Sequence, residues 1–164
     1  MIRAARLYIA VRFQNGVGVI EAARRRSVSA MKQILCVDDE VNILKTMKIA
    51  LENHGYEVLA TDDPSQAVRL VRERDIDLVT LDIRMPKISG FDIYKDLKKK
   101  KRPVPVLFVT AYTASFSTNS RDLVKMWKDE FSDGTTDILY KPFDIETLME
   151  KVVSLVGPPS QDEA

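Results

Sequence analysis

The apolar and polar positions of the chain alternate between two textures from Met31 onward. Short apolar runs, typical of strands covered on both faces of a parallel sheet, are each followed by apolar residues spaced three or four apart, as in amphipathic helices. The runs predict strands at residues 33–37, 56–60, 77–81, 103–109 and 136–140. The spaced patterns predict helices that begin near residues 41, 64, 89, 115 and 145.

Local signals mark several of the predicted helix ends. Asp63 followed by Pro64 supplies an N-cap and a proline in the first helical position, and Asp144 caps the last helix. Gly55 is suited to the position just after the first helix, where a positive φ is common.

Five strand–helix units in strict alternation predict an α/β fold, a doubly wound five-stranded parallel sheet with helices on both faces. In such sheets ligands bind beyond the carboxyl ends of the strands, at the point where the strand order reverses. Five polar residues follow or end predicted strands: Asp38, Asp39, Asp82, Thr110 and Lys141. We therefore expect them to meet at one edge of the sheet.

The chemistry of this set differs from what each residue suggests alone. Taken alone, an Asp pair before a helix is ordinarily an N-cap, and a Lys-Pro pair is ordinarily a turn. A Thr at the end of a strand ordinarily has no functional role. Carboxylates that converge need a cation, and Mg²⁺ prefers oxygen ligands. Asp82 can act as a nucleophile toward phosphorus, Lys141 can neutralise a phosphoryl oxygen, and Thr110 can hydrogen-bond one.

Residues 31–156 resemble the receiver domain of two-component response regulators, which has a flavodoxin-like (βα)5 fold. Four motifs in family order carry the resemblance: Val37-Asp38-Asp39-Glu40, Leu81-Asp82-Ile83-Arg84-Met85-Pro86 with Gly90, Val109-Thr110-Ala111 and Lys141-Pro142-Phe143. The resemblance implies that Asp82 is the phosphoacceptor. It also implies that Asp38, Asp39, Asp82 and the backbone carbonyl of Arg84 hold Mg²⁺.

The resemblance assigns roles to the later motifs as well. It makes Thr110 the switch hydroxyl and Lys141 the phosphate-binding lysine, with a cis bond between Lys141 and Pro142. The small Ala111 leaves room for the phosphoryl group. Arg84 and Tyr112 are expected to flank the path of water and to tune the rate of self-dephosphorylation.

Two features depart from the family pattern. Relatives place an aromatic residue three positions before the lysine, where this chain has Ile138, while Tyr140 precedes the lysine directly. The 31 positions from Thr110 to Lys141 also exceed the usual spacing, and the additional residues fall in 113–134. They indicate unusual partner selection or, alternatively, a longer helix packed on the sheet.

These residues predict a phosphorylation-dependent signalling module. The phosphoryl donor would be a histidine kinase or a His-phosphotransfer protein, and a downstream protein would read the face formed by residues 115–131, 136–140 and the last helix. A Mg²⁺-dependent phosphohydrolase is a second hypothesis, but Arg84 stands where such an enzyme needs an acid. A third hypothesis, a receiver that has lost phosphorylation, fits the complete polar set poorly.

Composition also indicates the cellular compartment and sets two terminal segments apart from the rest of the chain. The chain has one cysteine, Cys36, and no apolar run long enough to span a bilayer, which predicts a cytoplasmic protein. We also expect it to be a monomer or weak dimer. Residues 1–30 hold six arginines and one acid. We expect this extension to be disordered or to arise from a misassigned start; a basic arm, a transit peptide or a membrane-surface helix are alternatives. Residues 157–164 are expected to be a flexible tail, with no DNA-binding or other effector domain after them.

Overall fold

The computed structural model describes residues 8–13, 16–21, 31–99, 103–111 and 134–159. The chain divides into two compact units, Met1–Ala30 and Met31–Ala164. In the first unit, β1 (Tyr8–Phe13) pairs antiparallel with β2 (Gly16–Glu21). Both segments are rich in β-branched and aromatic residues, which favour extended pairing. The origin of residues 1–30 stays a prediction.

The second unit is built on a five-stranded parallel sheet with the order β4-β3-β5-β6-β7. Its strands are β3 (Gln33–Val37), β4 (Glu57–Thr61), β5 (Leu78–Leu81), β6 (Val106–Thr110) and β7 (Thr136–Tyr140). Strands β3 and β5 are neighbours, although β4 lies between them in the sequence. The strand order therefore reverses at β3 and β5, and the predicted doubly wound, flavodoxin-like sheet is confirmed.

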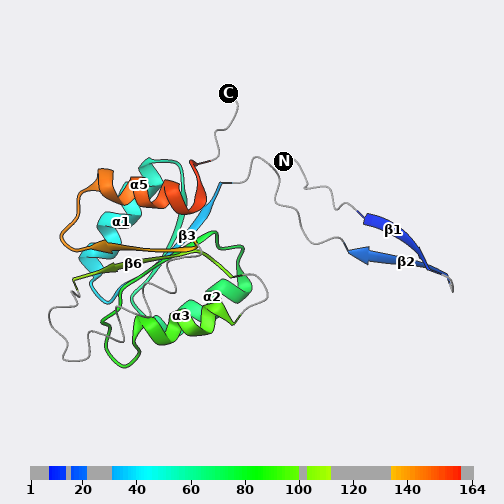
Figure 1. Ribbon diagram of the computed structural model, residues 1–164, viewed down its shortest axis with the longest axis horizontal. Coiled ribbons are helices and arrows are strands. Elements are labelled where there is room, and N and C mark those ends of the chain that lie inside the picture. The colour runs from blue at the N-terminus through cyan, green and yellow to red at the C-terminus, as the bar shows by residue number, and fades with distance from the viewer. Residues whose placement is uncertain (1–7, 14–15, 22–30, 100–102, 112–133, 160–164) are drawn as a thin grey trace. The chain divides into compact units, whose positions relative to one another are not determined.

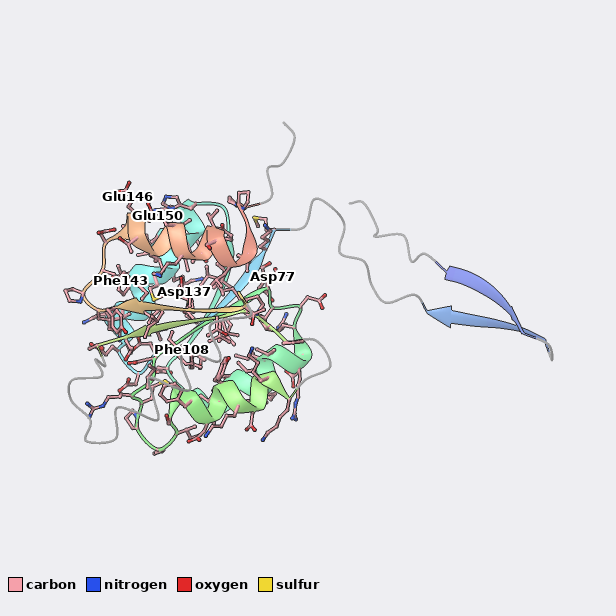
Figure 2. The ribbon with its side chains drawn as sticks, in the orientation of Figure 1. Asp77, Phe108, Asp137, Phe143, Glu146 and Glu150 are labelled. Atoms are coloured by element: carbon pink, nitrogen blue, oxygen red, sulfur yellow. The ribbon has the colours of Figure 1, made fainter. Side chains whose placement is uncertain are left out.

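Helices cover both faces of this sheet (Figure 1). The helical elements are α1 (Val41–Asn53), the 3₁₀ turn η1 (Pro64–Gln66), α2 (Ala67–Glu73), α3 (Gly90–Lys98) and α5 (Ile145–Val156). Helices α1 and α5 pack on one face, where Met47 and Leu148 are buried, and α2 and α3 pack on the other around Phe108 (Figure 2). Apolar burial on both faces explains why the strands read as continuous apolar runs.

The predicted helix signals act as expected. The side chain of Asp63 accepts a hydrogen bond from the backbone N–H of Ser65, and that of Asp144 accepts one from Thr147. Gly55 adopts φ +85° after the first helix. Strand β6 begins at Val106 instead of the predicted 103, and the two prolines at 103 and 105, which lack an N–H for the ladder, account for the difference.

Two side chains that directly precede strands hold the end of α5 and the residues after it as far as Pro158. The ammonium of Lys32 donates hydrogen bonds of 2.6 Å to the carbonyls of Val156 and Pro158, and the Tyr56 hydroxyl donates one of 2.9 Å to Gly157. Residues 157 and 158 of the predicted tail thus have hydrogen-bonded carbonyls, and the flexibility of residues 157–164 stays a prediction. Residues 160–164, and the predicted helix at 115–131, lie outside the described residues.

Among the residues that the structure describes, none forms a helix of the length and apolar character needed to cross a membrane.

Cys36 provides a test of this packing. Its side chain is fully buried in β3, and burial raises the pKa of the thiol to about 12. We expect thiol-specific alkylation of the folded chain at pH 8 to be slower than that of the urea-unfolded chain by roughly a thousandfold, because the sulfur becomes accessible only on opening. Since the unfolded thiol ionises near 9.0, its ionisation also favours unfolding, so stability falls as pH rises from about 9 toward 12. Equal alkylation rates in both states would contradict the buried position.

Candidate functional site

Two buried carboxylates lie side by side where the strand order reverses. Asp38 follows β3 and is 2% exposed, and Asp82 follows β5 and is 5% exposed. The backbone N–H of Asp82 donates a 3.0 Å hydrogen bond to the carbonyl of Val37, the last residue of β3. The parallel pairing of β3 with β5 thus fixes the spacing of the two acids.

The ammonium of Lys141 lies between these carboxylates. Its Nζ is 2.7 Å from Oδ2 of Asp38, 2.9 Å from Oε1 of Glu40 and 3.3 Å from Oδ2 of Asp82. Burial opposes the charged ammonium, but the hydrogen bonds it donates to Asp38 and Glu40 outweigh this and raise the pKa of Lys141. For Asp38 burial dominates and raises the pKa of the carboxyl group despite the contact with Lys141.

The acidic group differs in one member from the set expected from the sequence. Carboxylate oxygens of Asp38, Glu40 and Asp82 lie within 4.8 Å of one another. Asp39, the expected ligand, is exposed next to them, and its carboxylate makes no ion pair with any described residue. Glu40 was not among the predicted site residues, because an acidic residue before a helix is ordinarily interpreted as an N-cap. The signal was the third acid in the run Asp38-Asp39-Glu40.

Thr110, Ala111 and Pro142 are further predicted site residues that the structure describes. Thr110 ends β6 fully buried, and its carbonyl accepts a 2.9 Å hydrogen bond from the backbone N–H of Lys141. Ala111 is exposed after it, and Tyr112 lies outside the described residues. The bond between Lys141 and Pro142 is cis, as the resemblance implied.

Two further predicted residues, Arg84 and Ile138, have different surroundings. The side chain of Arg84 is exposed, while its backbone N–H donates a 3.2 Å hydrogen bond to Oδ1 of Asp82. Ile138 is half-buried on β7 and packs against the cluster around Phe108 on the face of α2 and α3. Arg84 is therefore part of the immediate surroundings of Asp82, whereas Ile138 belongs to the sheet that supports it.

Gly90 brings α3 directly against the phosphoacceptor candidate. A Cβ atom on Gly90 would lie 2.1 Å from the carbonyl oxygen of Asp82, which is closer than atoms approach without displacement. The backbone N–H of Gly90 also donates a 3.0 Å hydrogen bond to the carbonyl of Ile83. The residue after Asp82 is thus hydrogen-bonded to the first turn of α3. Only glycine fits at position 90, because a larger side chain has no room there.

Comparison with known proteins places this arrangement in a family. Residues 34–153 match the family model of the response regulator receiver domain. The chain belongs to this family, whose members are the receivers of two-component signalling.

Individual relatives agree. The response regulator SaeR of Staphylococcus aureus (strain USA300) is 32% identical over 126 residues, which are 77% of this chain and 51% of SaeR. The chain thus spans about half the length of the curated relatives it matches. The solved structure of the response regulator TrrA of Thermotoga maritima in complex with Mg²⁺-BeF is 34% identical with a TM-score of 0.62, covering 76% of this chain and 99% of TrrA. The chemotaxis protein CheY4 of Vibrio cholerae is 27% identical with a TM-score of 0.61, covering 77% of this chain and 99% of CheY4.

Gly90→Ala tests the clamp on Asp82. We expect a loss of about 1–3 kcal/mol of unfolding free energy, because the added methyl group must displace the backbone of Asp82 or the first turn of α3. Urea denaturation measures it. Gly134→Ala is a matched control, since its Cβ would meet nothing within 4 Å, although its φ of +69° also carries strain. A loss of less than about 1 kcal/mol in Gly90→Ala would contradict the close approach.

Proposed function

We propose that this chain accepts a phosphoryl group on Asp82 from a phosphohistidine, with Mg²⁺, and signals through the resulting change in its surface. The observation that carries the proposal is the convergence of Asp38, Asp82 and Lys141, all nearly buried, at the carboxyl ends of β3, β5 and β7. The donor would be a histidine kinase or a His-phosphotransfer protein.

The donor set at this edge suits a hard divalent cation. Three carboxylates within 4.8 Å of one another face a single ammonium, so the group carries excess negative charge that a metal ion would balance. The proposed ligands are Asp38, Asp39, Asp82 and the backbone carbonyl of Arg84. Asp39 lies exposed directly after Asp38, whereas Glu40, the third clustered carboxylate, is paired with Lys141. Bound there, Mg²⁺ would neutralise oxygens of the transferring phosphoryl group. The solved complex of TrrA with Mg²⁺-BeF supports this assignment by similarity.

The side chains that remain have complementary tasks in the transfer. A carboxylate oxygen of Asp82 forms the new P–O bond as the P–N bond of the phosphohistidine breaks, and the imidazole leaves with the bonding electron pair and takes up a proton. Lys141 would bind one phosphoryl oxygen, since its Nζ is already 3.3 Å from Asp82. The Thr110 hydroxyl would bind another. The protein assists its own phosphorylation and dephosphorylation and needs no further substrate site.

The output would pass through β7 and α5 to a downstream protein. Thr110 and Lys141 are joined by a backbone hydrogen bond of 2.9 Å, so a shift of one is transmitted to the other. The described part of this face exposes large apolar side chains at Tyr140, Ile145 and Val153. Their exposure is consistent with a surface that another protein covers.

Replacement of the phosphoacceptor tests the proposal. Incubated with Mg²⁺ and acetyl phosphate, the full chain should gain the mass of one phosphoryl group, whereas Asp82→Asn should gain none because an amide is not a nucleophile toward phosphorus. Omission of Mg²⁺ should reduce the adduct at least about tenfold. Asp62→Asn removes an exposed acid at the same sheet edge and should behave as wild type. A chain that gains no Mg²⁺-dependent adduct would refute the phosphoacceptor role.

Ile138→Tyr separates phosphorylation from its transmission. Because Ile138 packs against the apolar cluster around Phe108, the adduct on Asp82 should form as in wild type. The backbone NMR shifts that beryllofluoride induces in β7 and α5 should change, since a larger ring occupies the strand that carries the signal. Ile138→Val serves as the matched control with retained shape. Loss of phosphorylation in Ile138→Tyr alone would show that this position belongs to the reaction site.

A further inference from the structure

Glu40 occupies the N-cap of α1 without capping the helix by its side chain. Its backbone is extended (φ −85°, ψ 95°), and its carbonyl accepts the first hydrogen bond of α1 from Leu44 at 3.1 Å. An acidic side chain at this position ordinarily accepts a hydrogen bond from the second or third helical N–H. In Glu40 no such bond forms. The carboxylate is therefore committed elsewhere.

That partner is Lys141, 101 residues away in the sequence. Oε1 of Glu40 lies 2.9 Å from Nζ, between the distances of Asp38 at 2.7 Å and Asp82 at 3.3 Å. The side chain of Glu40 is 60% exposed, whereas that of Lys141 is 9% exposed. Glu40 thus holds the ammonium from the solvent side, and the weakest of the three contacts is the one to Asp82.

This geometry sets up a competition for hydrogen-bond donors. A lysine ammonium has three N–H groups, and three carboxylates already surround this one. A phosphoryl group on Asp82 adds an anion that needs at least one of these donors. Because Asp38 is buried and Glu40 is exposed to water, Glu40 can give up its share at the lower cost.

We propose that Glu40 is a positioning residue that retains Lys141 in the unphosphorylated state and so lowers the affinity of the site for a phosphoryl anion. The inference rests on the proposed function, since it concerns the same lysine. Glu40 would thereby influence how readily Asp82 is phosphorylated and how long the phosphoryl group persists, without contacting the phosphoryl group itself.

Two variants of the full chain test the competition. Glu40→Gln removes the charge, and Glu40→Asp keeps the charge but withdraws it by one methylene from Lys141. At saturating Mg²⁺, both should bind beryllofluoride about twofold to fivefold more tightly than wild type, the range expected for one partly exposed ion pair. Titration followed by backbone NMR gives the dissociation constants. The half-life of the phosphorylated chain should also be longer in both variants than in wild type.

Asp62→Asn is the control for net charge, because it removes an exposed acid at the same edge that has no contact with Lys141. It should leave the affinity unchanged. The proposal is overturned if Asp62→Asn tightens binding as much as Glu40→Gln, or if Glu40→Asp matches wild type. Unchanged or weaker binding by Glu40→Gln would overturn it as well.

A measurement without metal or anion keeps this test apart from the proposed function. In the ¹⁵N NMR spectrum of the metal-free chain, the Lys141 ammonium should exchange its protons with water faster in Glu40→Gln than in wild type. If wild type binds no beryllofluoride, the phosphoacceptor proposal fails. A difference in proton exchange would still show that Glu40 holds Lys141. If wild type binds and exchange is identical in both chains, Glu40 does not retain the lysine.

Discussion

The charge balance at Asp38, Asp82 and Lys141 is the constraint on which the remainder of the receiver depends. Two nearly buried carboxylates side by side repel each other and lose hydration, which is tolerated when a cation shares the site. The chain supplies that cation from the end of β7, the outermost of the five strands at one side. A sheet order that placed the end of β7 out of reach of the ends of β3 and β5 would leave these charges uncompensated. The electrostatics of the site and the topology of the sheet therefore favour the same fold.

The sequence was sufficient for the parts of this arrangement that follow from strand ends. Asp82, Thr110 and Lys141 could be placed together because parallel strands bring their carboxyl ends to one edge, however distant they are in sequence. The direction of a flexible side chain is different. Glu40 reads locally as a helix cap, and its contact with Lys141 depends on a partner 101 positions away. The hydrogen bonds to residues 156–158 could not be predicted for the same reason, since their donors, Lys32 and Tyr56, lie at least 101 positions earlier in the sequence.

Rigid support and adjustable contacts are distributed unequally around Asp82. Its carbonyl lies against Gly90 with no room for a methyl group, its backbone N–H is bonded to β3, and its carboxylate receives an N–H from Arg84. These backbone contacts hold the nucleophile candidate in a fixed position. The side of the site formed by Lys141 is different, because a long side chain with three acceptors can redistribute its hydrogen bonds without moving a strand.

The path from the site to the surface follows from the pairing of β6 with β7. Thr110 and Tyr140 are partners in the register, and the next residue, Lys141, donates its N–H to the carbonyl of Thr110. In the proposed switch, a phosphoryl group draws both the hydroxyl of Thr110 and the ammonium of Lys141, so the two strand ends must move together. Ile138 lies two residues before Tyr140, on the same face of β7, and packs against the apolar cluster around Phe108. It stands where the family pattern described above has an aromatic side chain. A branched aliphatic side chain has no ring to swing between two positions. Tyr140, the last residue of β7 and the neighbour of Lys141, is instead an exposed aromatic side chain at this end of the strand.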